Sequence, residues 1–231
     1  WTATGDGEVS VEARSRVGSL DRLDSRQDYL RTGTGVEAVF RGITLEVQKT
    51  FQPSVHTVAE SRTVNEGGHI IDNVTSGVSA GQWPSGAELK ADGYYFAGLT
   101  QDDLKNSIRP SAGMSADGFM RQIAARGYNP SAYGHTSFTG SGQAHAVTAM
   151  AGPGPAAAQP YTVKRNSGFG TWVWAIRKSA QDKDVQQWLK GDALSDFLEA
   201  NETVAHRNIV SVDSTVSEHT AAAGAQLTDH I

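Results

Sequence analysis

Stretches in which polar and β-branched residues alternate constrain this chain most, because a period of two fits a half-buried strand and not a helix. The clearest are Glu8–Glu12 and Val36–Val47 in the first half, and the bulky run Gly170–Arg177 in the second. The pattern predicts a β-rich N-terminal region and a core strand at Gly170–Arg177.

Helix and turn signals divide the rest of the chain. Thr100–Lys105 opens with a capping residue and an acidic first turn, and Ser115–Arg126 has apolar residues at helical spacing, so both predict short helices. Turn-forming residues gather between Gly67 and Gly86, which indicates a boundary near residue 88. We therefore expect a β-rich region over residues 1–88 and an α/β domain over residues 89–231.

Three further segments have local signals after residue 150. Alternating Gly and Pro in Ala151–Ala158 predict a mobile loop, because neither residue suits a regular element. Asp184–Leu198 is compatible with a helix, and Ile209–Val212 with a final strand.

Composition excludes several functional classes. The net charge of −5 comes with no basic block, so nucleic acid is not an expected partner. No apolar run reaches the ~18 residues of a membrane helix. The chain has no cysteine, and its seven histidines lack ligand spacing, so we predict no metal site. The start at Trp1 indicates a processed product or an excised domain.

Four segments of the second half follow one another in a recognisable order. They are Gly93–Thr100, then Tyr133–Thr139 with Gln143–Val147, then Thr171–Ile176, and finally Glu199–Ile209 with its Glu-x-x-Ala-His-Arg pattern. In this order the segments resemble the cholera/pertussis-type mono-ADP-ribosyltransferase toxins. The resemblance implies an α/β (α+β) domain with that family's split β-sheet over residues 89–231, and a helix at Gln143–Val147.

The resemblance also implies the site. Glu202 matches the family's catalytic glutamate, and Glu199 takes the place of its companion if the turn is one residue longer, since Ala200 stands at the usual position. Ser137 and Thr136 match the hydroxyl-rich strand beside the nicotinamide. Tyr95 lies on the strand that carries the family's arginine.

The family's arginine has no clear counterpart here. Its place falls on Phe96 or Ala97, and neither side chain can anchor a phosphate as a guanidinium does. An alternative register uses Arg22, because Leu20–Arg26 is close to the family's opening motif, but it requires a large insertion before Glu202.

The function that the resemblance implies is transfer of ADP-ribose from NAD, as substrate, to a protein acceptor. A carboxylate at the ribose 2′-hydroxyl would stabilise the oxocarbenium-like transition state. Such a toxin or effector would be secreted or delivered into a target cell, with residues 1–88 available for a delivery or binding partner. Two alternatives remain open: a non-enzymatic structural or binding protein, such as a virion or surface component, and a catalytically inactive transferase fold.

Overall fold

The computed structural model describes residues 28–32, 35–39, 50–154, 156, 159–216 and 220–230. Contacts divide the chain into two units, Trp1–Thr50 and Phe51–Ile231. In the first unit, β1 (Asp28–Thr32) and β2 (Gly35–Val39) form an antiparallel hairpin.

The strand predicted over Val36–Val47 is confirmed for its first residues, which belong to β2. The rest of that segment, the predicted strand Glu8–Glu12 and the candidate Arg22 lie outside the described residues.

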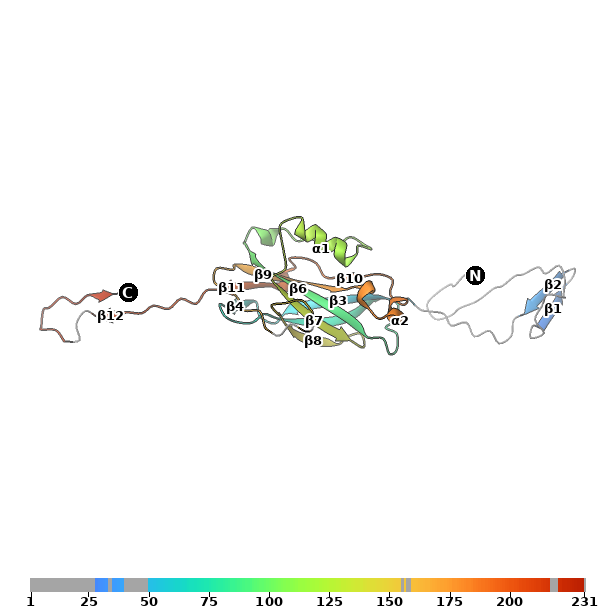
Figure 1. Ribbon diagram of the computed structural model, residues 1–231, viewed down its shortest axis with the longest axis horizontal. Coiled ribbons are helices and arrows are strands. Elements are labelled where there is room, and N and C mark those ends of the chain that lie inside the picture. Colours follow the sequence, from blue (N-terminus) through green and yellow to red (C-terminus); the bar gives the residue numbers. More distant parts are fainter. Residues whose placement is uncertain are drawn as a thin grey trace. The chain divides into compact units, whose positions relative to one another are not determined.

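The second unit is a mixed α+β fold made mostly of strands, arranged as a curled, split sheet (Figure 1). A small antiparallel sheet has the order β3-β5-β8 and a large one the order β4-β11-β9-β6-β7, with β10 paired to β9. The small sheet comprises β3 (Gln52–Ala59), β5 (Ile71–Ala80) and β8 (Ala144–Thr148); the large sheet comprises β4 (Thr63–Asn65), β6 (Leu89–Leu99), β7 (Ala132–Phe138), β9 (Phe169–Ile176), β10 (Ala193–Leu194) and β11 (Thr203–Arg207). The predicted boundary near residue 88 thus lies between β5 and β6 of one unit.

The two sheets join at two corners. At one corner Tyr133, on β7, and Met150, just after β8, exchange backbone hydrogen bonds of 2.9 and 2.7 Å. At the other, Phe51 donates to Trp188 and accepts from Lys190. At each corner these backbone hydrogen bonds lie at the ends of strands. The two sheets are therefore separate layers along most of their length.

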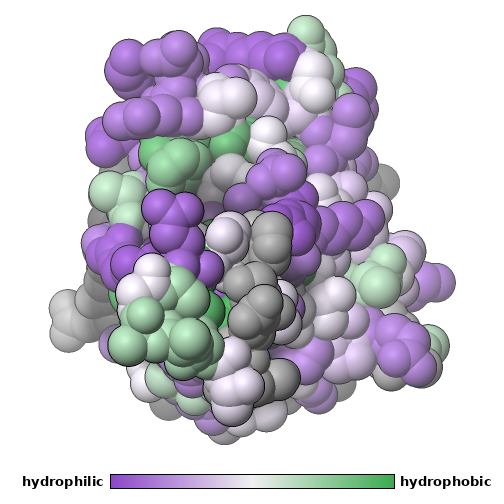
Figure 2. Space-filling view, turned by 90° about the vertical axis from the view of Figure 1, so that its left-hand side faces the viewer, coloured by the Kyte–Doolittle hydropathy of each residue, from purple (hydrophilic) through white to green (hydrophobic). Residues whose placement is uncertain are grey.

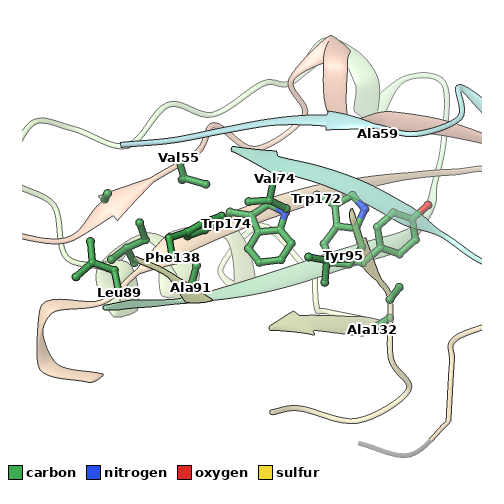
Figure 3. Packing of buried hydrophobic residues seen from close by; sticks show 14 of the residues in the cluster. Val55, Ala59, Val74, Leu89, Ala91, Tyr95, Ala132, Phe138, Trp172 and Trp174 are labelled. Carbon is green, nitrogen blue, oxygen red and sulfur yellow. The ribbon is translucent and has the colours of Figure 1, made fainter. Parts of the chain in front are cut away.

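The space between the sheets holds the larger of two hydrophobic clusters (Figure 3). Trp172 and Trp174 of β9 lie almost parallel there, with ring centroids 5.5 Å apart, and Tyr95 of β6 is 5.1 Å from Trp172. All three side chains are completely buried. The predicted core strand at Gly170–Arg177 is confirmed, because β9 is buried on both faces.

Glycines make room for these large rings. An added Cβ would lie 2.7 Å from the Trp174 ring at Gly93 and 2.9 Å from it at Gly134. Gly93 is paired to Gly134 on one side and to Trp174 on the other, so the indole lies over two adjacent glycines. Gly170 makes the same kind of space for Tyr95.

The outer face of the large sheet is covered by α1 (Ala116–Ala124), which Figure 1 shows on the side of β6 and β9 opposite β8. Phe119 and Ile123 of the helix pack with Phe96 and Val173 of the sheet. Ser115 caps the helix by accepting a hydrogen bond from the Gly118 amide. The helix predicted over 115–126 is therefore confirmed.

Several shorter elements complete the described chain. They are the 3₁₀ turns η2 (Asp103–Lys105), η3 (Lys178–Ala180) and η4 (Ala200–Glu202), the single-turn helix α2 (Lys183–Gln186), and the paired strands β12 (Thr215–Val216) and β13 (Asp229–His230). The short helix predicted at Thr100–Lys105 is thus a 3₁₀ turn, in which Thr100 donates to Asp103.

Three local predictions are wrong. The helix expected over Asp184–Leu198 stops after one turn. The reason is that Trp188 and Lys190 form backbone hydrogen bonds with Phe51, and the Asp192 carboxylate accepts hydrogen bonds from two backbone amides of other segments. The helix implied at Gln143–Val147 is instead β8, paired to β5. No strand forms at Ile209–Val212, where the apolar side chains are exposed.

The surface seen in Figure 2 is mostly hydrophilic, and hydrophobic side chains occur there in small separate groups. Such groups are usual on a protein surface and identify no interface by themselves. No helix in the described ranges has the length and hydrophobicity needed to cross a bilayer.

Candidate functional site

Glu202, the carboxylate that the sequence points to for catalysis, is completely buried between the two sheets. It ends η4 and precedes β11, and its Oε1 accepts a hydrogen bond from the hydroxyl of Thr57 on β3. Its Oε2 has no partner among the described residues. Burial raises the pKa of Glu202 to about 9, so the side chain is uncharged at neutral pH.

A second carboxyl faces the same space from the small sheet. Asp72 on β5 is also completely buried, and its Oδ2 accepts a 2.6 Å hydrogen bond from Nε1 of Trp174. Burial raises the pKa of Asp72 to about 6. Its Oδ1 has no partner in the described part of the chain. Asp72 and Glu202 are called the carboxyl pair below.

Register explains how the carboxyl pair comes together. Thr57 is paired to Val74, and Asp72 is two residues from Val74 on the same face of β5, so Asp72 is a diagonal neighbour of Thr57. On the large sheet, Thr203 is paired to Thr171; continuing this register by one residue sets Glu202 beside Trp172. The negative charge of Asp72 adds to the rise in the pKa of Glu202.

Tyr95 belongs to a separate chain of hydrogen bonds in the core. Its hydroxyl is 2.7 Å from Nε2 of His206, and Nδ1 of His206 is 2.8 Å from the hydroxyl of Ser167. Ser167 donates to the carbonyl of Lys164, so its hydroxyl accepts from His206 and Tyr95 donates to Nε2. Burial lowers the pKa of His206, which favours this neutral ring. The chain of bonds joins β6 to β11.

Thr136 lines a groove of about 500 Å³ between β7 and β8. Its hydroxyl is 2.8 Å from Nδ1 of His145, and the ring of His145 stacks on Phe138. His135 lines the same groove and is 3.0 Å from Asp92.

Ser137 and Glu202 lie on different faces of the large sheet. Alternation along β7 turns Ala132, Gly134 and Phe138 toward the core and Ser137 to the outer face. β9 and β6 also stand between β11 and β7, a separation of about 14 Å at the usual strand spacing.

Glu199 lines a separate pocket of about 350 Å³ at the corner between β3 and the segment that follows β10. Asp196, Asn201 and Thr57 are among the other lining residues. Glu199 is exposed, and Thr57 lies between this pocket and the buried Glu202.

The arginine positions suggested by the resemblance contribute no guanidinium. Phe96 is buried against Phe197, with ring centroids 5.1 Å apart, and Ala97 is at the end of β6. A nearby cation with defined partners is Arg177, which binds Asp92 and Asp117 and lies over the ring of Tyr94 on the outer face of the sheet.

Asp72 and Thr57 were not identified from the sequence. The sequence does contain a signal for Asp72. Residues alternate along this segment, and Asp72 lies on the same face of the strand as Val74 and Ser76, so a charged residue is placed on the buried face. No local signal marks Thr57 as the partner of Glu202, since the two are joined only by the packing of the sheets.

Taken together, the fold and the site define a mixed α+β protein with a curled, split sheet and two protonatable carboxyls enclosed in its core. Within the described ranges, no group of three or more His, Asp or Glu side chains could hold a metal ion. The chain matches no protein-family model, no curated protein and no solved structure.

Proposed function

We propose that residues 51–216 form a non-catalytic structural or binding domain, of the kind found in a virion or surface component, and not an active ADP-ribosyltransferase. The observation that carries this proposal is the state of Glu202. The side chain has no exposed surface, and its pKa is raised to about 9.

A transferase needs an ionised carboxylate at the ribose of bound NAD. Because its pKa is raised to about 9, Glu202 is largely protonated at pH 7. Its Oε1 is hydrogen-bonded to Thr57, and no part of the side chain is exposed. An uncharged carboxyl in a closed core can neither contact the ribose nor stabilise positive charge on it.

The remaining residues of the expected site support the same proposal. Tyr95 is in the core with His206, and Ser137 is on the outer face of the large sheet. Thr136 opens into the groove between β7 and β8, which Glu202 does not line. Tyr95, Ser137 and Thr136 thus lie in three different places, and Glu199 lies in a fourth, the pocket beside η4.

A transferase with the family's split sheet is the second candidate, and the pocket beside η4 favours it. There Glu199 and Asn201 are accessible in a pocket large enough for part of a nucleotide. In this second candidate Glu199 supplies the ionised carboxylate, and the resemblance in segment order reflects common descent.

The experiment is incubation of the chain with labelled NAD and cell lysate, followed by measurement of released nicotinamide and of labelled protein. The structural proposal predicts neither product above the background without protein. It also predicts no thermal shift with NAD, although a ligand at 100 times its Kd would add about 2.7 kcal/mol.

Two matched variants separate the candidates. Turnover that Glu199→Gln abolishes and Glu202→Gln spares would support the transferase with Glu199 as its carboxylate. Turnover lost in Glu202→Gln alone would overturn the structural proposal. A sizing measurement adds an independent test, since large symmetric assemblies favour a structural protein and a monomer favours an enzyme.

A further inference from the structure

The carboxyl pair lies where the two sheets meet, and no cation among the described residues pairs with either carboxyl. Asp72 comes from the small sheet and Glu202 from the large one, and both are completely buried. Their hydrogen bonds come from neutral groups: Trp174 Nε1 and the Asn73 backbone amide at Asp72, and Thr57 Oγ1 at Glu202. Each carboxyl keeps one oxygen without a partner in the described residues.

The surrounding charges make ionisation harder. Asp72, Glu199 and Asp196 all add negative potential at Glu202. Arg62, on the segment before β4, bonds instead to the carbonyl of Ala200 and to Asn201 at the protein surface.

A further titratable group near η4 is His56 on β3. It lines the pocket that also contains Glu199 and Asp196, on the far side of Thr57 from Glu202. A buried carboxylate without a cation costs several kcal/mol, so ionisation is strongly coupled to exposure of the site.

We propose that the carboxyl pair is a pH-sensitive switch between the two sheets: the sheets hold together while the pair keeps a proton on Glu202, and they separate at this point when both carboxyls are ionised. Opening brings water to the oxygens that lack partners and releases the Trp174 and Thr57 hydrogen bonds.

The direction of the pH dependence follows from linkage. Both folded-state pKa values, about 6 for Asp72 and about 9 for Glu202, are above the ordinary values of carboxyls. Stability from these groups is therefore complete below about pH 4 and is lost as the pH rises through 6 and then 9. His206 acts in the opposite direction, because burial lowers its pKa, but only below about pH 7.

Between pH 7 and 9, Glu202 is therefore the member of the carboxyl pair whose protonation differs most between the folded and the unfolded chain. There the folded chain retains a proton that the unfolded chain has lost, so the unfolding constant is expected to rise about tenfold from pH 7 to 8 and about fivefold from pH 8 to 9, where Glu202 itself begins to ionise. The experiment is urea unfolding of the whole chain across this window, with the unfolding constant extrapolated to water.

Two variants provide the comparison. Glu202→Gln imitates the protonated side chain, keeps an acceptor for Thr57 and is expected to remove the rise of about 50-fold between pH 7 and 9. Glu199→Gln removes an exposed carboxylate three residues away and is expected to keep most of it.

A wild-type unfolding constant that stays level or falls from pH 7 to 9 overturns the proposal. So does a Glu202→Gln variant with the wild-type rise. If Glu202→Gln does not fold, the protons released on unfolding at pH 8 provide the second measurement: about one per wild-type molecule supports the switch, and none overturns it.

Discussion

The glycine at position 93 should be nearly intolerant of substitution, because Trp174 lies directly against it. In Gly93→Ala the new Cβ would be 2.7 to 2.9 Å from three atoms of the indole. Carbon atoms in contact prefer about 3.5–4.0 Å, so the ring has to move by roughly 0.8 Å or more. Gly134 on the next strand and Trp172 beside the indole leave it little space to do so.

The cost of Gly93→Ala has two parts. Overpacking of this kind costs about 1–3 kcal/mol. Displacement of the indole also weakens the 2.6 Å bond from Trp174 to Asp72, and an unpaired buried acceptor costs about 1–3 kcal/mol more. The total of about 2–6 kcal/mol corresponds to a fall in Tm of roughly 5–20 °C for a domain of this size.

The assay is thermal and urea unfolding of Gly93→Ala beside Gly191→Ala. An added Cβ at Gly191 meets its nearest neighbour at 3.8 Å, an ordinary contact, so this control should change stability by no more than ~0.5 kcal/mol. Phenylalanine lacks the indole atoms that clash, so Trp174→Phe should make Gly93→Ala less costly. Equal stabilities for the two alanine variants, or strict additivity with Trp174→Phe, would refute the packing argument.

Three other substitutions test separate parts of the fold by urea unfolding. Tyr95→Phe should cost about 1–3 kcal/mol, because Nε2 of the half-buried His206 loses its donor, and a cost near zero would contradict the proposed direction of that bond. Arg177→Gln should cost about 1–2 kcal/mol, because the 16% exposed side chain holds Asp92 and α1 to the sheet; an unchanged midpoint would show that solvent replaces these bonds. Gly168→Ala should cost at least ~2 kcal/mol, since φ is +60° and an added Cβ meets a backbone oxygen at 2.3 Å, and wild-type stability would contradict that geometry.

Local sequence patterns predicted the elements whose structure depends on local physics. The core strand β9 and the helix α1 follow from alternation and from capping by Ser115. The mixed α+β class with a split sheet also agrees with the sequence prediction.

Segments whose structure depends on distant partners were predicted poorly. Asp184–Leu198 has helical spacing, but its backbone bonds to Phe51 and to β9 stop the helix after one turn. Gln143–Val147 becomes a strand because β5 offers an unpaired edge to it. Neither the partners of Asp184–Leu198 nor the edge of β5 can be recognised from the local sequence.

The candidate site shows the same limit. The order of segments in the sequence indicated Glu202 as a catalytic carboxylate. The residue is unusual in the structure too, but because it is a buried, uncharged carboxyl. Its burial depends on Thr57, which precedes it by 145 residues, and on Asp72. The spacing of motifs can predict where a glutamate lies in the chain, but its protonation state depends on the packing of two sheets.

The protonation state of Glu202 is the central claim, and carboxyl NMR measures it most directly. In protein labelled with ¹³C at glutamate side chains, the resonance absent from Glu202→Gln identifies this residue. We predict that it is in the protonated form at pH 7 and titrates near pH 9. A Glu202 resonance that is already ionised at pH 7 and titrates near the ordinary value of about 4.3 would contradict the account and restore Glu202 as a candidate catalytic carboxylate.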